Sequence, residues 1–110
     1  MKRREAEYLA YIRESIERVE RWTARGREAV LADEVLFEAV LHRLETLADA
    51  VAYLSDPLKQ RHPEIPWRSI TDFRNRLAHG YLDVKPERVW DVIVVHLPAL
   101  KSVVDAELRG

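Results

Sequence analysis

Cysteine is absent from this sequence of 110 residues, and its absence excludes disulfide bonds, thiolate metal sites and cysteine nucleophiles. Glycine and proline are few, at 3 and 5 residues, whereas alanine, leucine, glutamate and arginine are abundant, a mixture that favours helix. Net charge is nearly absent, because 18 basic and 19 acidic residues leave a formal charge of −1. Any binding of nucleic acid therefore requires a local basic patch rather than a global positive field.

Long hydrophobic runs are missing as well, and none approaches the roughly 20 residues that a membrane span requires. The first residues, MKRREAEY, are basic but lead into alternating charge instead of the hydrophobic core of a signal peptide. We therefore expect no membrane association, and the lack of cysteine suits the cytoplasm. Hydrophobic residues make up 47% of the chain, enough for a small core, so residues 1–110 are expected to form a single domain.

The first half of the sequence predicts two amphipathic helices. The first covers residues 2–23 and is expected to end before Gly26; its hydrophobic stripe consists of Leu9, Ile12, Ile16, Val19 and Trp22. The second is expected to begin at Asp33 as an N-cap and to end near residues 55–58, where prolines interrupt the chain. Its stripe consists of Leu36, Val40, Leu44, Leu47, Val51, Leu54 and Leu58.

The second half predicts two more helices and no strand. One begins at Pro66, ends near His79 before Gly80, and places Trp67, Ile70, Phe73 and Leu77 inside. After a loop over residues 81–85, Pro86 opens the last helix, in which Pro98 is expected to cause a kink. The inner stripe of this helix is predicted to be Trp90, Ile93, Val94, Leu97, Leu100, Val104 and Leu108. The predicted fold class is therefore all-α, an up-and-down bundle of four main helices.

The most informative stretch is Ile70–Tyr81, which reads ITDFRNRLAHGY. On a helical wheel Asp72, Asn75, Arg76 and His79 share the face opposite the hydrophobic stripe, with Asn75 and His79 one turn apart. Arg74 falls beside the stripe instead, about 140° from His79 on an ideal helix. An arginine at the core edge needs a partner or a path to solvent, because an unpaired buried charge is unstable.

Arg74 and His79 can act on one substrate in three ways. The last helical turn can deviate near Gly80, the arginine can bend around the helix, or a second subunit can bring the two groups together. An imidazole transfers protons near neutral pH, and a guanidinium stabilises charge on phosphate oxygens. The pair can thus cleave a phosphodiester without a metal, although on spacing alone such residues are more often surface or capping residues.

Other chemistry has less support in the sequence. The four histidines, His42, His62, His79 and His96, form no i,i+4 pair on a helix, which disfavours a histidine zinc site. No glycine-rich phosphate loop or nucleophile elbow is present. The three tryptophans occupy inner stripes, so we expect them in the core rather than as base-stacking platforms. Tyr81 follows the third helix in a loop, where it either packs against the last helix or exposes its hydroxyl.

Residues 74–81, RNRLAHGY, resemble the R-x4-H-x-Y signature of HepT-like toxins, in the HEPN superfamily. The lead-in HPEIPW at residues 62–67, the trailing LDV at 82–84, the pair Val89-Trp90 and the segment LPAL at 97–100 are similar to the same family. R-x4-H alone is common, whereas the ordered set is far more specific. The resemblance covers roughly residues 34–108.

The resemblance implies the toxin half of a prokaryotic toxin–antitoxin pair, a metal-independent endoribonuclease that needs no cofactor. It implies a homodimer whose R-x4-H motifs meet in a cleft, with Arg74 and His79 as catalytic residues and Asn75 as a supporting residue. Its partner would be a small nucleotidyltransferase antitoxin of the MntA type. By the same resemblance, Tyr81 is the position that such an antitoxin would modify with AMP, placing bulk and negative charge beside the site.

The sequence departs from the family at one point and leaves one alternative open. Relatives often carry Gly-Glu-Ala in the second helix, where this chain reads Leu47-Ala48-Asp49-Ala50. Asp49 could replace the glutamate, but its shorter side chain calls into question the contact with the arginine. The alternative function is a catalytically silent helical adaptor that binds a nucleotidyltransferase, and a plain four-helix dimerisation domain is a third possibility.

Overall fold

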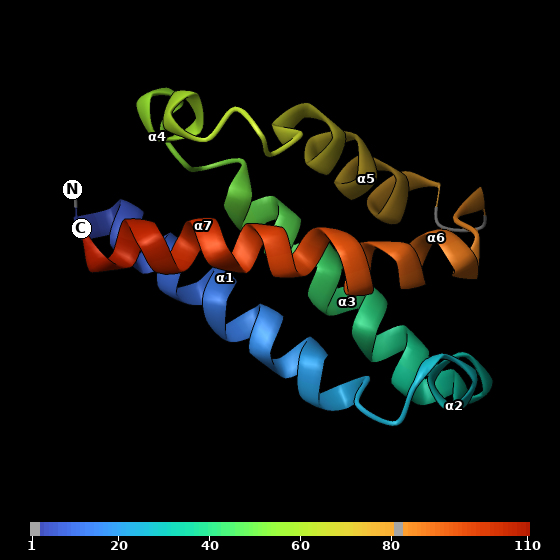
Figure 1. The fold of residues 1–110 in the computed structure, drawn as a ribbon. Coiled ribbons are helices and arrows are strands. Elements are labelled where there is room, and N and C mark those ends of the chain that lie inside the picture. Colours follow the sequence, from blue (N-terminus) through green and yellow to red (C-terminus); the bar gives the residue numbers. More distant parts are fainter. Residues whose placement is uncertain (1–2, 81–82) are drawn as a thin grey trace.

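A computed structural model describes residues 3–80 and 83–110, and all of its elements in these ranges are helices. The long helices are α1 (Arg3–Trp22), α3 (Glu34–Val51), α5 (Trp67–His79) and α7 (Leu97–Arg109). The short ones are α2 (Arg27–Ala32), α4 (Asp56–Arg61), α6 (Pro86–Asp91) and the π-helical turn η2 (Val92–His96), which leads from α6 into α7. Successive long helices run in opposite directions, which confirms the all-α bundle (Figure 1).

The core lies between α1, α3 and α7, and α5 packs against α3. The predicted stripes of the first two helices are largely confirmed, because their central residues are fully buried while Trp22 and Leu36 pack partly buried at the edges. Trp67 and Trp90 also pack partly buried against the core, as expected. None of the described helices is long and apolar enough to cross a bilayer.

The predicted end of the second helix is wrong. Helix α3 already ends at Val51, and a separate helix, α4, begins at Asp56. Pro57 cannot continue a helix but fits its first turn, and the Ser55 hydroxyl accepts a hydrogen bond from the Leu58 N–H at 3.3 Å. Leu54 and Leu58 are buried as expected, but they lie in the turn and in α4 rather than on a continuous helix.

Both ends of the segment between α1 and α3 are set by single residues. Gly26 has φ 98° and ψ 171°, a conformation that only glycine adopts readily, and it marks the break between α1 and α2. Helix α2 was not expected, because six residues are too few for a helical period to be recognised. Asp33 is the N-cap of α3 as predicted, since its side chain accepts from the Leu36 N–H at 3.0 Å.

The kink expected at Pro98 takes the form of the π turn η2. Proline has no N–H to donate to the Val94 carbonyl, and the chain instead closes a wider turn in which the Leu97 N–H donates to Val92. The wider turn changes which residues face inward: Val92 and Ile93 are buried, whereas Val94 is 50% exposed. The prediction of Val94 as a core residue is therefore wrong.

Candidate active site on α5

Helix α5 carries the residues that the sequence singled out, and its amphipathic pattern decides how they face. Leu77 is buried and Ile70 and Phe73 pack partly buried against the core. Asp72, Asn75, Arg76 and His79 are all exposed, as the wheel predicts. The helix starts one residue later than expected, with Pro66 as its N-cap, and ends at His79, where the Gly80 N–H donates to the Arg76 carbonyl at 2.8 Å. The outer face of α5 is thus polar and open to solvent.

Arg74 lies at the edge of this face, half-buried, and contacts α3. Its Nε is 3.1 Å from Oδ1 of Asp49, with 31% of the arginine and 52% of the aspartate side chain exposed. The contact has the distance but not the angle of a hydrogen bond, so it is an ion pair. The aspartate therefore reaches the arginine despite its short side chain, and the question that the sequence raised about this contact is answered.

Asn75 completes the surroundings of the arginine. Its Oδ1 accepts a hydrogen bond from Nη1 of Arg74 at 3.3 Å. The guanidinium is thereby held from two sides, by a carboxylate of α3 and by the next residue of its own helix. Its role at a substrate remains a prediction, but the orientation of its planar group is restricted by these two contacts.

His79 makes no side-chain contact with this pair among the described residues. Its side chain is exposed in the last turn of α5, and it makes no hydrogen bond or ion pair with any residue in the described ranges. The contacts of Arg74 with Asp49 and Asn75 do not involve His79. That Arg74 and His79 act on one substrate, within one chain or across two subunits, stays a prediction. Tyr81, the expected site of modification, lies outside the described residues.

The start of α5 is fixed by a charged cluster that the sequence did not reveal. Glu107 of α7 accepts from Nη2 of Arg61 at 2.7 Å and from its Nε at 3.2 Å, and lies 2.6 Å from Nε2 of His62. Hydrogen bonding by Arg61, aided by His62, lowers the pKa of Glu107 to about 2. Trp67 adds to the anchor, because its indole N–H donates to the His62 carbonyl at 3.0 Å.

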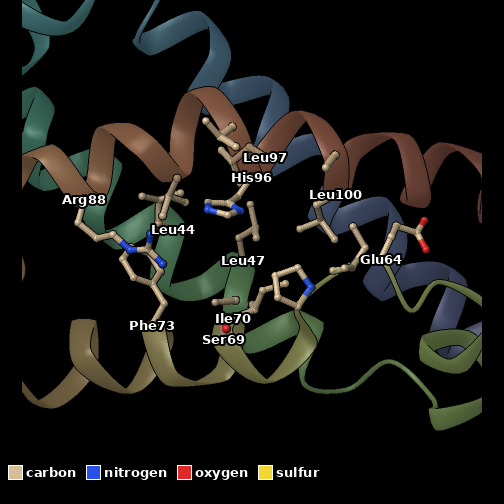
Figure 2. Close-up of a pocket in the computed structure, with 16 residues that line it drawn as sticks. Leu44, Leu47, Glu64, Ser69, Ile70, Phe73, Arg88, His96, Leu97 and Leu100 are labelled. Atoms are coloured by element: carbon tan, nitrogen blue, oxygen red, sulfur yellow. The ribbon is translucent and has the colours of Figure 1, made fainter.

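An apolar groove of about 360 Å³ lies on the inner side of α5, bounded by α3, η2 and α7. Figure 2 shows Ile70 and Phe73 of α5 on one side of it and His96 and Leu97 on the other, with Leu44 and Leu47 behind. Arg74, Asn75 and His79 do not line this groove. Among the described residues no cluster of three histidine or acidic side chains could hold a metal ion.

Comparison with known proteins agrees with the resemblance and extends it. Residues 12–107 match the family described as Ribonuclease HepT-like, a longer stretch than the motifs indicated. A probable ribonuclease HepT of Thermococcus cleftensis is 35% identical over 103 residues, which are 93% of this chain and 94% of that protein. A putative RNase of Caldanaerobacter subterraneus is 31% identical over 93% of this chain and 92% of its own. No solved structure matches significantly. The chain belongs to the HepT-like ribonuclease family.

Proposed function

We propose that this protein is the toxin of a prokaryotic toxin–antitoxin pair and cleaves RNA without a metal ion, using Arg74 and His79. The proposal rests above all on the Arg74 guanidinium, which Asp49 and Asn75 hold at the edge of an exposed polar face in a chain of the HepT-like family. Four arginines and two acidic residues lie between Arg61 and His79, a local basic excess in a chain without net positive charge.

The reaction is attack of an RNA 2′-oxygen on the adjacent phosphorus, with release of the 5′-oxygen. The 2′-hydroxyl loses its proton to an imidazole and the leaving 5′-oxygen gains one, so the products carry a 2′,3′-cyclic phosphate and a 5′-hydroxyl. Arg74 stabilises the charge that grows on the phosphate oxygens. A homodimer supplies two His79 imidazoles, one for each proton transfer, and brings an imidazole of one copy to the guanidinium of the other.

The apolar groove beside α5 supports the homodimer. Val95, which lines the groove, is 54% exposed, its neighbour Val94 is 50% exposed, and exposed apolar residues beside an apolar groove are typical of association surfaces. Light scattering on purified protein is expected to give twice the mass of the chain. Introducing a charge by Val95→Glu should lower the dimer fraction and the cleavage activity together.

Cleavage of RNA in the presence of EDTA tests the enzymatic proposal directly. His79→Ala should abolish activity, and Arg74→Ala should lower kcat by about 10²- to 10³-fold, the cost of removing one charge-stabilising donor. His42→Ala is the matched control, because His42 is an exposed histidine on α3 outside the site. Cleavage by His79→Ala, or a requirement for added metal, would remove the mechanism.

We further propose that a nucleotidyltransferase antitoxin of the MntA type neutralises the toxin by transferring AMP from ATP to the Tyr81 hydroxyl, with release of pyrophosphate. Coexpression with the partner and ATP should increase the mass of the peptide containing Tyr81 by one adenylyl group, and Tyr81→Phe should prevent it. The lack of a contact between Arg74 and His79 among the described residues also suits the alternative, a silent adaptor that recruits the transferase. Expression without the partner distinguishes them, since a toxin arrests growth and an adaptor does not.

A further inference from the structure

A second concave surface lies between the N-terminal half of α1 and the C-terminal half of α3. It encloses about 420 Å³ and is lined by Glu7, Tyr8, Tyr11, Thr46, Asp49, Ala50 and Tyr53. We call it the tyrosine hollow, because three of the four tyrosines of the chain line it. The hollow is separate from the apolar groove beside α5, with which it shares no lining residue.

The rings of the tyrosine hollow are held in place from both helices. Tyr8 of α1 and Tyr53 beyond the end of α3 stack with their centroids 5.0 Å apart and their planes inclined by 11°. The Tyr11 hydroxyl donates to Thr46 Oγ1 at 2.9 Å. Tyr53 is nonetheless 64% exposed, so its ring is fixed on one side and accessible to solvent. A fixed, accessible ring is the surface on which a planar ligand stacks at small entropic cost.

The tyrosine hollow adjoins the proposed active site through one residue. Asp49 lines the hollow and, at the same time, lies 3.1 Å from Nε of Arg74. Figure 1 shows α5 and α1 on opposite sides of α3, the helix that carries this aspartate. A ligand in the hollow is therefore next to the residue that holds the guanidinium.

The polar groups of the tyrosine hollow indicate what kind of ligand fits. Two carboxylates, Glu7 and Asp49, line it, and each is paired with an arginine, Arg3 at 3.4 Å and Arg74 at 3.1 Å. These carboxylates would repel a free phosphate inside the hollow. The same carboxylate oxygens could accept hydrogen bonds from a planar ring that carries N–H donors at its edge. Nucleobases combine such an edge with a face that stacks on tyrosine.

We propose that the tyrosine hollow is a base-binding subsite, in which a base of single-stranded RNA stacks on Tyr53 while an adjoining phosphate lies at Arg74. The assignment rests on the proposed RNase function and adds to it a set of residues that position the substrate. Bases with an exocyclic amino group are favoured over uracil, because only they offer that group to Glu7 and Asp49. Base-paired RNA is excluded, since its bases cannot unstack onto the ring.

Binding of an RNA oligonucleotide that cannot be cleaved, with 2′-fluoro groups in place of its 2′-hydroxyls, tests the subsite. Tyr53→Ala should raise the Kd about tenfold, as expected for the loss of one base–aromatic stack, and Tyr53→Phe should leave it unchanged. Val35→Ala is the matched control, because Val35 is an exposed apolar residue of α3 that does not line the hollow. Ring resonances of Tyr53 in the native protein should shift on addition of the oligonucleotide, a readout that does not depend on how the variant folds.

The outcomes separate this subsite from the function on which it rests. If the native protein cleaves RNA and Tyr53→Ala does so with the same KM and Kd, the subsite is refuted and the RNase stands. If the native protein neither binds nor cleaves RNA, the proposed function fails and the subsite fails with it. If Tyr53→Ala binds RNA normally but no longer binds a nucleotidyltransferase partner, the hollow is a protein contact and the subsite is again refuted.

Discussion

Replacement of Asp49 by alanine should separate the stability of the fold from the activity of the site. The Arg74–Asp49 ion pair is 31% and 52% exposed, and ion pairs this accessible contribute about 0–1 kcal/mol to folding. The free energy of unfolding of Asp49→Ala should therefore differ from that of the native protein by less than about 1 kcal/mol. Urea unfolding measures this difference.

The effect on catalysis should be much larger. Without Asp49 the guanidinium keeps only its 3.3 Å hydrogen bond to Asn75, a neighbour on the same helix. A displacement of about 1 Å in a catalytic group can reduce the rate about 10²-fold, so we expect kcat to fall by about 10- to 100-fold. The KM for RNA should change less than kcat, because the substitution removes a negative charge beside the phosphate at the same time as one acceptor of the proposed base subsite.

Steady-state cleavage of an RNA substrate in EDTA provides kcat and KM for the native protein, Asp49→Ala and Asp49→Glu. The glutamate variant keeps the carboxylate and should retain much more activity than the alanine variant. An unchanged kcat in Asp49→Ala would refute the argument that the aspartate orients Arg74. A parallel loss of activity and several kcal/mol of stability would refute it too, since the contact would then hold the fold rather than the site.

Three further predictions concern the stability of the helical framework. Because the pKa of Glu107 is lowered, its ionised carboxylate stabilises the fold fully above the ordinary pKa of 4.5, and this stabilisation is lost as the pH falls towards 2. Glu107→Gln should remove this pH-dependent part of the free energy of unfolding. Urea unfolding across that range should show a smaller decline for the variant, and equal declines would contradict the role of the cluster with His62. Gly26→Ala should destabilise the protein by about 1–3 kcal/mol through its positive φ alone, because no atom lies within 4 Å of an added Cβ; unchanged thermal unfolding would show that the turn relaxes. Leu58→Ala should cost about 2–5 kcal/mol, whereas Val35→Ala at an exposed position should cost little, and a small loss for Leu58 would mean that α4 contributes little to the core.

Hydrophobic periodicity predicted the four long helices because each buries one continuous stripe. It did not reveal α2 or α4, since six residues span fewer than two turns. It also joined α4 to the preceding helix, because Leu54 and Leu58 continue the spacing of the stripe although α3 ends at Val51 and Pro57 lies in the first turn of α4. The hydrophobic pattern therefore predicts which residues are buried, but it does not predict where the helix is interrupted.

The wheel of α5 correctly placed Asn75 and His79 on the outer face and Arg74 at the core edge. The identity of the partner of Arg74 needed the tertiary structure, because only the packing of α5 on α3 determines that an aspartate is long enough to reach it. The contacts across the tyrosine hollow and within the Glu107 cluster join residues 35 or more positions apart in the sequence, so no local spacing could have indicated them.

The π turn at Val92–His96 holds one residue more than a regular α-helical turn would hold at this place. Deleting a single residue of this turn would let α6 continue into α7 with the ordinary hydrogen bonds of an α-helix. Because a π turn absorbs its extra residue locally, Val89 and Trp90 would keep the places they now occupy. A variant of this chain that lacks one residue of the turn and carries alanine in place of Pro98 should therefore bury the same side chains.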